Sequence, residues 1–318
     1  MSSSSKHSAL PLVDSGIHAA VGRVAPEVNG AVLGKRAAHR IHWTPLIAIS
    51  IIHLVALLAV VPAFFSWQAL ATAIVMQWLC ACLGITIGFH RLLTHRSFKT
   101  PKPVEYLLSW LGSLCWQGGP VQWVATHRLH HQHSDSDEDP HTPRHGFCWS
   151  HVLWCFAFKP EFDVYEKYSQ YALDLARDRG HVFIEKTTML WQFVVAGLLY
   201  LWGYYLGGAM MGWSCVLWGT FVRLVYVYHI TWFVNSASHV WGYRNYETTD
   251  GSRNLWWVGL LAFGEGWHNN HHAYPRSARH GLKPWEFDLT WLTIRTMALF
   301  GLATDIRLPE KGASREMR

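Results

Sequence analysis

The sequence predicts an all-α integral membrane protein, with four transmembrane helices in two hairpins and a cytoplasmic helical cap that holds a histidine-rich metal site. Composition is the first reason. Half of the 318 residues are hydrophobic and only 15% are charged, against about 25% in ordinary soluble domains. The second reason is the pattern: long apolar runs alternate with polar segments, and 21 histidines gather mainly in the polar segments.

The four predicted spans form two pairs. Residues 43–65 contain one ionisable side chain, His53, and residues 67–89 contain no charged side chain. Residues 187–206 and 209–233 make up the second pair, and this last run contains Arg223. An apolar helix of about 20 residues crosses the ~30 Å hydrocarbon core of a bilayer. Because the link inside each pair is very short, each pair is predicted to be a helical hairpin.

Charged flanks predict the orientation of these spans. The two hairpin turns have no charge, whereas the opposite ends are flanked by Lys35, Arg36, Arg40, Arg91, Arg96, Lys99, Lys102, Lys186, Arg244 and Arg253. Basic flanks remain in the cytoplasm, so both termini and the cap (residues 90–186 and 234–308) are expected there. This also accounts for the net charge of +6, and no nucleic-acid motif accompanies it.

One domain is expected over residues 41–308, between flexible tails at 1–40 and 309–318. The apolar stretch 104–124 inside it could be mistaken for a fifth span. A single crossing there would put His95 and His127 on opposite sides of the membrane, although they are expected to meet at one site. The six cysteines include no Cys-x-x-Cys pair and are interpreted as small buried hydrophobic residues.

Eight histidines stand in three groups, the pair His90 and His95 and the two His-x-x-His-His boxes His127, His130, His131 and His268, His271, His272. On a helix, residues three and four apart lie on one side, so each box can present three nitrogens to a small volume. Neutral imidazole is the commonest protein ligand for iron, copper and zinc. One metal needs three or four protein ligands, so eight histidines predict two metals.

A rival pattern is Glu-x-x-His, the ligand pair of soluble di-iron bundles. It occurs at Glu138 to His141 and at Glu265 to His268. Pro140 makes a helix unfavourable at the first. Glu265 is therefore interpreted as an acceptor that orients a ligand histidine. His133, His141, His145 and His280 are interpreted as surface residues or as partners of ligands, and His53 as a packing residue.

Four segments carry a family resemblance: HRLLTHRSF from His90, WVATHRLHHQHSD from Trp123, NSASH from Asn235 and GEGWHNNHH from Gly264. Over residues 41–308 the chain resembles the membrane fatty acyl desaturases of the stearoyl, Δ9 type, and it looks most like the bacterial and plant acyl-lipid enzymes. The resemblance implies two iron ions bound by nine histidines, namely His90, His95, His127, His130, His131, His239, His268, His271 and His272, with Asn235 binding through a water.

The reaction that this resemblance implies is O₂-dependent formation of a cis double bond at C9 of a saturated C16–C18 acyl chain. Electrons would come from an external donor, ferredoxin or cytochrome b5. The resemblance also favours a bacterial inner membrane, otherwise the ER or a plastid. Animal acyl-CoA enzymes have a basic residue two positions before the second box, where this chain has Ala125, so a lipid-linked substrate is favoured. Ile74, Trp78 and Cys82 share one helix face and correspond to the family's tunnel end, with Trp78 as the candidate stopper.

Three alternatives stay open at this point. A related di-iron lipid hydroxylase would use the same boxes and release an alcohol instead of an olefin. An acyl-CoA-linked desaturase would differ only in the carrier. A non-catalytic metal carrier would place its ionisable groups near the bilayer midplane, whereas these boxes follow the span ends. For Arg223, packing and binding of a substrate headgroup are equally compatible with the sequence.

Overall fold

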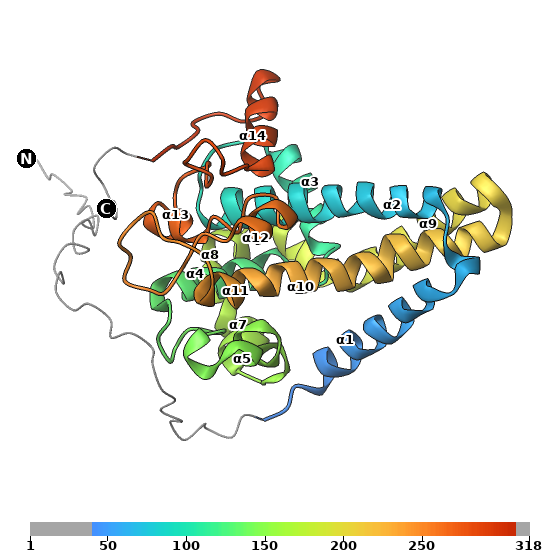
Figure 1. Ribbon diagram of the computed structural model, residues 1–318, viewed down its shortest axis with the longest axis horizontal. Helices are drawn as coiled ribbons and strands as arrows, with labels where there is room; N and C mark the ends of the chain where they lie inside the picture. The colour runs from blue at the N-terminus through green and yellow to red at the C-terminus, as the bar shows by residue number, and fades with distance from the viewer. Residues whose placement is uncertain (1–39, 310–318) are drawn as a thin grey trace, which may run out of the picture. The chain divides into compact units, whose positions relative to one another are not determined.

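The computed structural model describes residues 40–309, and the regular structure within this range is helical (Figure 1). Extended pairing among these residues is limited to isolated bridges, such as Tyr243 with Asn254. The all-α prediction is thus confirmed for the described residues, and the two predicted tails fall almost entirely outside them. The α-helices are α1 (Trp43–Ala56), α2 (Trp67–Gln77), α3 (Lys102–Ser113), α4 (Pro120–His133), α5 (Phe147–His151), α6 (Pro160–Asp163), α7 (Tyr165–Tyr168), α8 (Leu173–Ala176), α9 (Arg179–Val216), α10 (Arg223–Asn235), α11 (Ala237–Val240), α12 (Trp256–Leu261), α13 (His268–Ala273) and α14 (Leu289–Leu299).

Other helical turns link these helices. The 3₁₀ turns are η1 (Leu57–Val60), η2 (Pro62–Phe64), η4 (Pro143–His145), η5 (Leu153–Phe156) and η6 (Ser169–Ala172). Two segments are π-helical, η3 (Trp78–Thr94) and η7 (Leu217–Val222). η3 continues α2 and contains His90 near its end, whereas η7 joins α9 to α10. The long apolar helices therefore change their pitch within the apolar stretches.

Three helical stretches of the described chain are long and apolar enough to cross a membrane: Trp43–Val60, Trp67–Thr94 and Arg179–Val240. The first ends earlier than the sequence predicted, because α1 gives way to η1 at Leu57 and Pro62 starts η2. Proline has no N–H to continue a preceding helix. Ser66 then caps α2, accepting a hydrogen bond of 3.0 Å from the Ala69 N–H. The apolar stretch 104–124 forms α3 and the start of α4, and it is not among the three stretches.

The third stretch reverses direction within α9. Gly207 and Gly208 have non-helical dihedral angles, and Gly208 has a φ of +78°, a conformation that residues with a Cβ rarely adopt. A Cβ on Gly203 would collide with the Met211 carbonyl oxygen, so the segments on either side of the two glycines pack closely. Figure 1 shows this turn in yellow at the end of α9. The apolar runs 187–206 and 209–233 therefore lie against each other.

The hydrophobic core lies where α2, η3, α3, α4, α9 and α10 pack together, and it includes Phe89, Leu108 and Leu224. Arg223 is buried beside it. This guanidinium donates to the carbonyl oxygens of Gly219 (2.8 Å) and Leu114 (3.0 Å), so it ties η7 and α10 to the end of α3.

The cysteines follow the prediction in part. Cys80, Cys82, Cys115 and Cys215 are buried, and Cys155 is half-buried, but Cys148 is exposed. No described cysteine forms a disulfide. Cys148 corrects the expectation that all six are buried. It lies in the five-residue helix α5, whose buried residues are its neighbours Trp149 and Ser150.

Candidate metal centre

Four segments that lie far apart in the sequence bring the nine predicted histidines together. These segments are the end of η3 with His95, helix α4, helix α11 and helix α13. The histidines form two groups. In each group, ring nitrogens from all members lie within 4.8 Å of one another. The five-histidine group is His90, His95, His127, His131 and His271, and the four-histidine group is His130, His239, His268 and His272.

The π-helix η3 explains how His90 and His95 reach the same group. Five residues apart, these side chains would point in different directions on an α-helix. In η3 the wider turn joins residues five apart, and the His95 N–H donates to the His90 carbonyl oxygen at 3.1 Å. The two ring centroids lie 4.8 Å apart. Such π-helical turns occur frequently at functional sites.

Each His-x-x-His-His box supplies both groups. In α4, His127 and His131 are four residues apart and face the five-histidine group, whereas His130 faces the other. In α13 the division is reversed, because His268 and His272 join the four-histidine group and His271 joins the five. At about 100° per residue, positions i and i+4 diverge by only ~40°, and position i+3 lies on the other side of i. The spacing therefore suits two neighbouring centres.

The distances within each group fit a bound metal. In the five-histidine group, His271 Nε2 lies 3.1 Å from His90 Nε2 and 2.9 Å from His131 Nε2. In the four-histidine group, His268 Nε2 lies 3.1 Å from His239 Nε2, and the Nε2 atoms of His130 and His272 lie 3.4 Å apart. Nitrogens bound ~2.1 Å from one ion lie about this far from each other.

Burial keeps most of these rings neutral. Desolvation, followed by the influence of neighbouring histidines, lowers the pKa well below the ordinary value in His95, His127, His131, His268 and His271. A neutral imidazole has a free lone pair, which is the form that binds a metal. The chemistry of both groups therefore fits metal ions with nitrogen ligands.

Four carboxylates contact the outer ring nitrogens of these histidines. Glu265 Oε2 lies 2.5 Å from His90 Nδ1. The other three were not predicted: Asp139 with His130 (3.0 Å), Asp135 with His239 (3.1 Å) and Asp250 with His272 (2.7 Å). Such contacts fix the ring orientation and make the ligand nitrogen more basic. Asp135 and Asp139 belong to the acidic run after the second box, which was a usable signal. Asp250 lies in a separate loop, and no pattern in the sequence indicates its contact with His272.

These carboxylates remain ionised despite their burial. Burial opposes ionisation of Glu265, but His90 and Arg91 outweigh it and lower the pKa of that carboxyl. In the same way, burial opposes ionisation of Asp250, and His272 outweighs it, so the pKa of Asp250 is also lowered.

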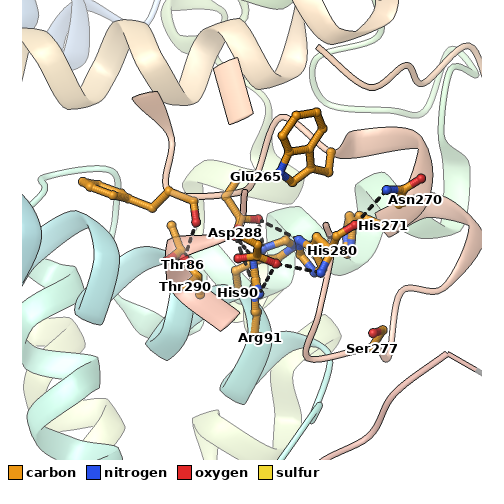
Figure 2. Close-up of polar contacts among 12 residues, drawn as sticks. Thr86, His90, Arg91, Glu265, Asn270, His271, Ser277, His280, Asp288 and Thr290 are labelled. Carbon is orange, nitrogen blue, oxygen red and sulfur yellow. Dashed lines mark hydrogen bonds and ion pairs between the residues drawn. The ribbon is translucent and has the colours of Figure 1, made fainter. Parts of the chain in front are cut away.

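Arg91 links the five-histidine group to the C-terminal segment (Figure 2). Its guanidinium is fully buried and donates to Glu265 Oε1 (3.0 Å), to both Asp288 oxygens (3.0 Å each) and to the Ala278 carbonyl oxygen (2.7 Å). Asp288 also accepts from the Trp291 N–H and begins α14. Arg91 was predicted only as a basic flank. Its position instead fixes the carboxylate that orients His90.

Glu185 of α9 holds the N-terminus of α4, which carries the second box. Its carboxylate accepts hydrogen bonds from the Val121 N–H (2.8 Å), the Gln122 N–H (3.4 Å) and the Tyr168 hydroxyl (2.7 Å). The first N–H groups of a helix have no partner within it, and a carboxylate there also suits the helix dipole. No pattern in the sequence indicates this contact.

A cavity of about 860 Å³ leads to the metal centre, and its lining includes His127 and Asn235. Its size is within the ordinary range for small-molecule sites, about 300–1,000 Å³. The Trp123 ring stacks on His127 with centroids 5.0 Å apart. Trp123 Nε1 donates to Gln117 Oε1 (3.3 Å), whose amide donates to Thr231 Oγ1 (3.0 Å). These three side chains form one connected wall of the cavity.

The predicted tunnel-end residues do not line this cavity. Ile74 and Trp78 are 61% and 39% exposed, whereas Cys82 is buried. The change from α2 to the π-helix η3 at Trp78 alters the helical register on which their common face was predicted.

The remaining histidines have several roles. His141 is buried against Asp139 and lines the cavity, and desolvation lowers its pKa to about 3. His280 is buried, with Nδ1 3.5 Å from Glu265. His133 and His145 are partly exposed. His53 Nδ1–H donates to the Ile49 carbonyl oxygen (2.7 Å), and His53 Nε2 lies 3.2 Å from His229 Nε2, as in a packing residue.

This geometry defines a helical protein with apolar spans and two adjacent histidine-rich centres. Comparison with known proteins gives its family. The sequence model of the fatty acid desaturase family matches residues 65–295. The sn-1 stearoyl-lipid 9-desaturase of Anabaena variabilis is 49% identical over 272 residues, 86% of this chain and 96% of that protein. The chain belongs to the fatty acid desaturase family.

Two further relatives are named for different substrates. The sn-2 palmitoyl-lipid 9-desaturase of Nostoc sp. (strain 36) is 44% identical over 295 residues, 92% of this chain and 98% of that protein. The acyl-CoA C20 Delta5-desaturase of Anemone leveillei is 41% identical over 266 residues, 84% of this chain and 82% of that protein. Relatives named for lipid-linked and for CoA-linked chains thus both occur among the matches.

Proposed function

We propose that this protein desaturates a saturated C16–C18 acyl chain at C9, with the chain carried on a membrane glycerolipid. The observation that carries the proposal is the pair of histidine groups beside a cavity large enough for an acyl chain. The protein resembles lipid 9-desaturases over most of its length. The overall change converts –CH₂–CH₂– with O₂, two electrons and two protons into –CH=CH– and two water molecules.

Two iron ions are the proposed cofactors, one in each histidine group. The five-histidine group would hold one ion, and the four-histidine group would hold the other, with Asn235 contributing through a water. Bound iron with O₂ supplies the oxidising power that breaks an unactivated methylene C–H bond, for which no acid, base or nucleophile of the chain suffices.

The protein's own contribution is positioning and exclusion of water. Trp123, Gln117 and Thr231 are connected by hydrogen bonds along the cavity beside His127. A wall fixed in this way can hold one pair of methylenes at the metal centre. The aromatic side chains Trp116, Trp154 and Trp232 also line the cavity, and they limit access of water to the site.

In the membrane we propose four crossings in two hairpins, because the third apolar stretch turns back at Gly207 and Gly208. The cap and both termini would then be cytoplasmic, in agreement with the basic flanks. An external donor, ferredoxin or cytochrome b5, would deliver electrons on that side.

Expression in a host that lacks its own desaturase tests this function. The expected result is a C9 cis olefin in glycerolipids, located by mass spectrometry for each lipid class. An alcohol at the same carbon would instead identify a hydroxylase. A product that appears first on acyl-CoA would identify the CoA-linked alternative. The Anemone relative is named for a CoA-linked substrate.

A further inference from the structure

The cavity beside the metal centre opens between two helices that belong to the apolar stretches. On one side it is lined by Thr44, Ala48 and Ile49 of α1, and on the other by Lys186 and Met189 of α9. Met189 lines the cavity and is still 58% exposed, and Thr44 is exposed as well. The cavity therefore reaches the molecular surface between α1 and α9. We call these five residues the portal.

Both sides of the portal lie where an apolar segment begins. The stretch that starts at Trp43 has no acidic or basic side chain other than His53, and Lys186 is the last charged residue of α9 before the apolar run. Lysines at span ends extend to the interface between hydrocarbon and water. Since an apolar run begins on each side, this end of the cavity would lie at the interface, where the glycerol esters of membrane lipids are found.

The charges around the cavity do not favour CoA, which is a nucleotide, as the carrier of the acyl chain. Its lining contains two lysines, Lys159 and Lys186, but three carboxylates, Asp163, Glu166 and Glu185. A site for several phosphates would need an excess of positive charge, because like charges repel an anionic ligand during approach. The phosphates of CoA would meet no such excess here, whereas the ester region of a glycerolipid requires none.

We propose that the acyl chain enters sideways from the bilayer through the portal while its glycerol backbone remains at the interface. The inference rests on the proposed function, since it takes an acyl glycerolipid as the substrate. From the portal, the cavity leads past Trp123 to His127 and Asn235. The portal thus accounts for selection of a lipid-linked chain by the depth at which the site opens.

Bulky substitutions in the portal provide the first test. Ala48→Trp and Met189→Trp would each put an indole ring into the path of the chain. Matched controls are Ile47→Trp and Leu190→Trp, since these neighbours are 54% and 57% exposed and do not line the cavity. In reconstituted vesicles, the portal variants should desaturate stearoyl glycerolipid at least about tenfold more slowly, a change of ~1.4 kcal/mol in the barrier. The controls should keep the parental rate.

A second test detects the lipid directly and does not depend on turnover or on a variant that folds. A glycerolipid with a photoreactive diazirine next to the ester carbonyl of its stearoyl chain is reconstituted with the unmodified protein. The expected labels lie in peptides covering residues 44–49 and 186–189. Labels confined to the cap segment 159–166, or no label, would overturn the portal.

The outcomes separate the two proposals. If the unmodified protein forms no olefin on any lipid-linked chain, the proposed function fails, whatever the labels are. If it does form the olefin but both portal variants retain the parental rate with full iron content, the function stands and the portal is wrong.

Discussion

The two histidine groups lie side by side but are supported in different ways. In the four-histidine group, three of the four rings contact an aspartate: His130, His239 and His272. In the five-histidine group, His90 is the only ring that contacts a carboxylate of the described residues 40–309, that of Glu265. Its other rings are held by packing, as where Trp123 stacks on His127. One centre therefore depends on charge and the other on close packing.

This difference has a consequence for metal binding. An aspartate that accepts from an imidazole increases the electron density on the ligand nitrogen and offsets the charge of the bound cation. Three such aspartates around four ligands should favour the more oxidised state of that ion. The two proposed ions should therefore differ in affinity and in spectroscopic properties, although the protein ligands proposed for both are all imidazoles.

Removal of one ligand from either group should have the largest effect. His130→Ala takes a ligand from the four-histidine group, and His271→Ala takes one from the five-histidine group. Both proteins should insert into membranes, contain less iron and form no detectable olefin, because the proposed reaction requires both iron ions. Iron analysis and lipid profiling measure this. Full iron content and activity in either variant would remove that histidine from the ligand set.

Removal of single carboxylates should separate the groups. Asp139→Asn and Asp250→Asn weaken the support of the four-histidine group, and Glu265→Gln weakens that of the five. Loss of such a partner lowers metal affinity or activity by about 10–100-fold. Mössbauer spectra of ⁵⁷Fe protein should show one iron population reduced by the aspartate changes and the other by Glu265→Gln. Equal loss of both populations in all three variants would contradict the difference in support.

Glu185→Ala should affect both groups to a similar and smaller extent. It removes the acceptor for the Val121 N–H and the Tyr168 hydroxyl at the start of α4, the helix that serves both centres. Losing a helix cap typically costs about 0.5–2 kcal/mol. A lower Tm and a parallel decrease in both iron populations are expected, with Glu185→Gln, which retains an acceptor oxygen, closer to the parent protein. An unchanged Tm in the alanine variant would mean that α4 needs no cap from α9.

The histidines and the apolar runs could be predicted because their signals are local. Spacings of three and four residues place a box on one side of a helix, and a long apolar run gives a membrane helix. The distribution of ligands between the two groups could not be predicted, since it depends on how α4 and α13 face each other. Asp250 and Glu185 were missed for the same reason: each contacts its partner through the fold and has no sequence pattern of its own.

The π-helical pitch of η3 could not be predicted from the sequence either. It concerns the residue for which the smallest effect is expected, Trp78. Trp78 begins the π-helix and was predicted to close the acyl tunnel beyond the metal centre. If so, Trp78→Ala should leave both iron populations unchanged and shift the preferred chain from C16 towards C18 or longer. Each additional buried methylene contributes about 0.8 kcal/mol, which is a severalfold preference. Competition between palmitoyl and stearoyl lipids, with Ile74→Ala as a neighbouring comparison, measures the shift. An unchanged ratio in a stable Trp78→Ala protein would mean that the channel ends against another part of the fold.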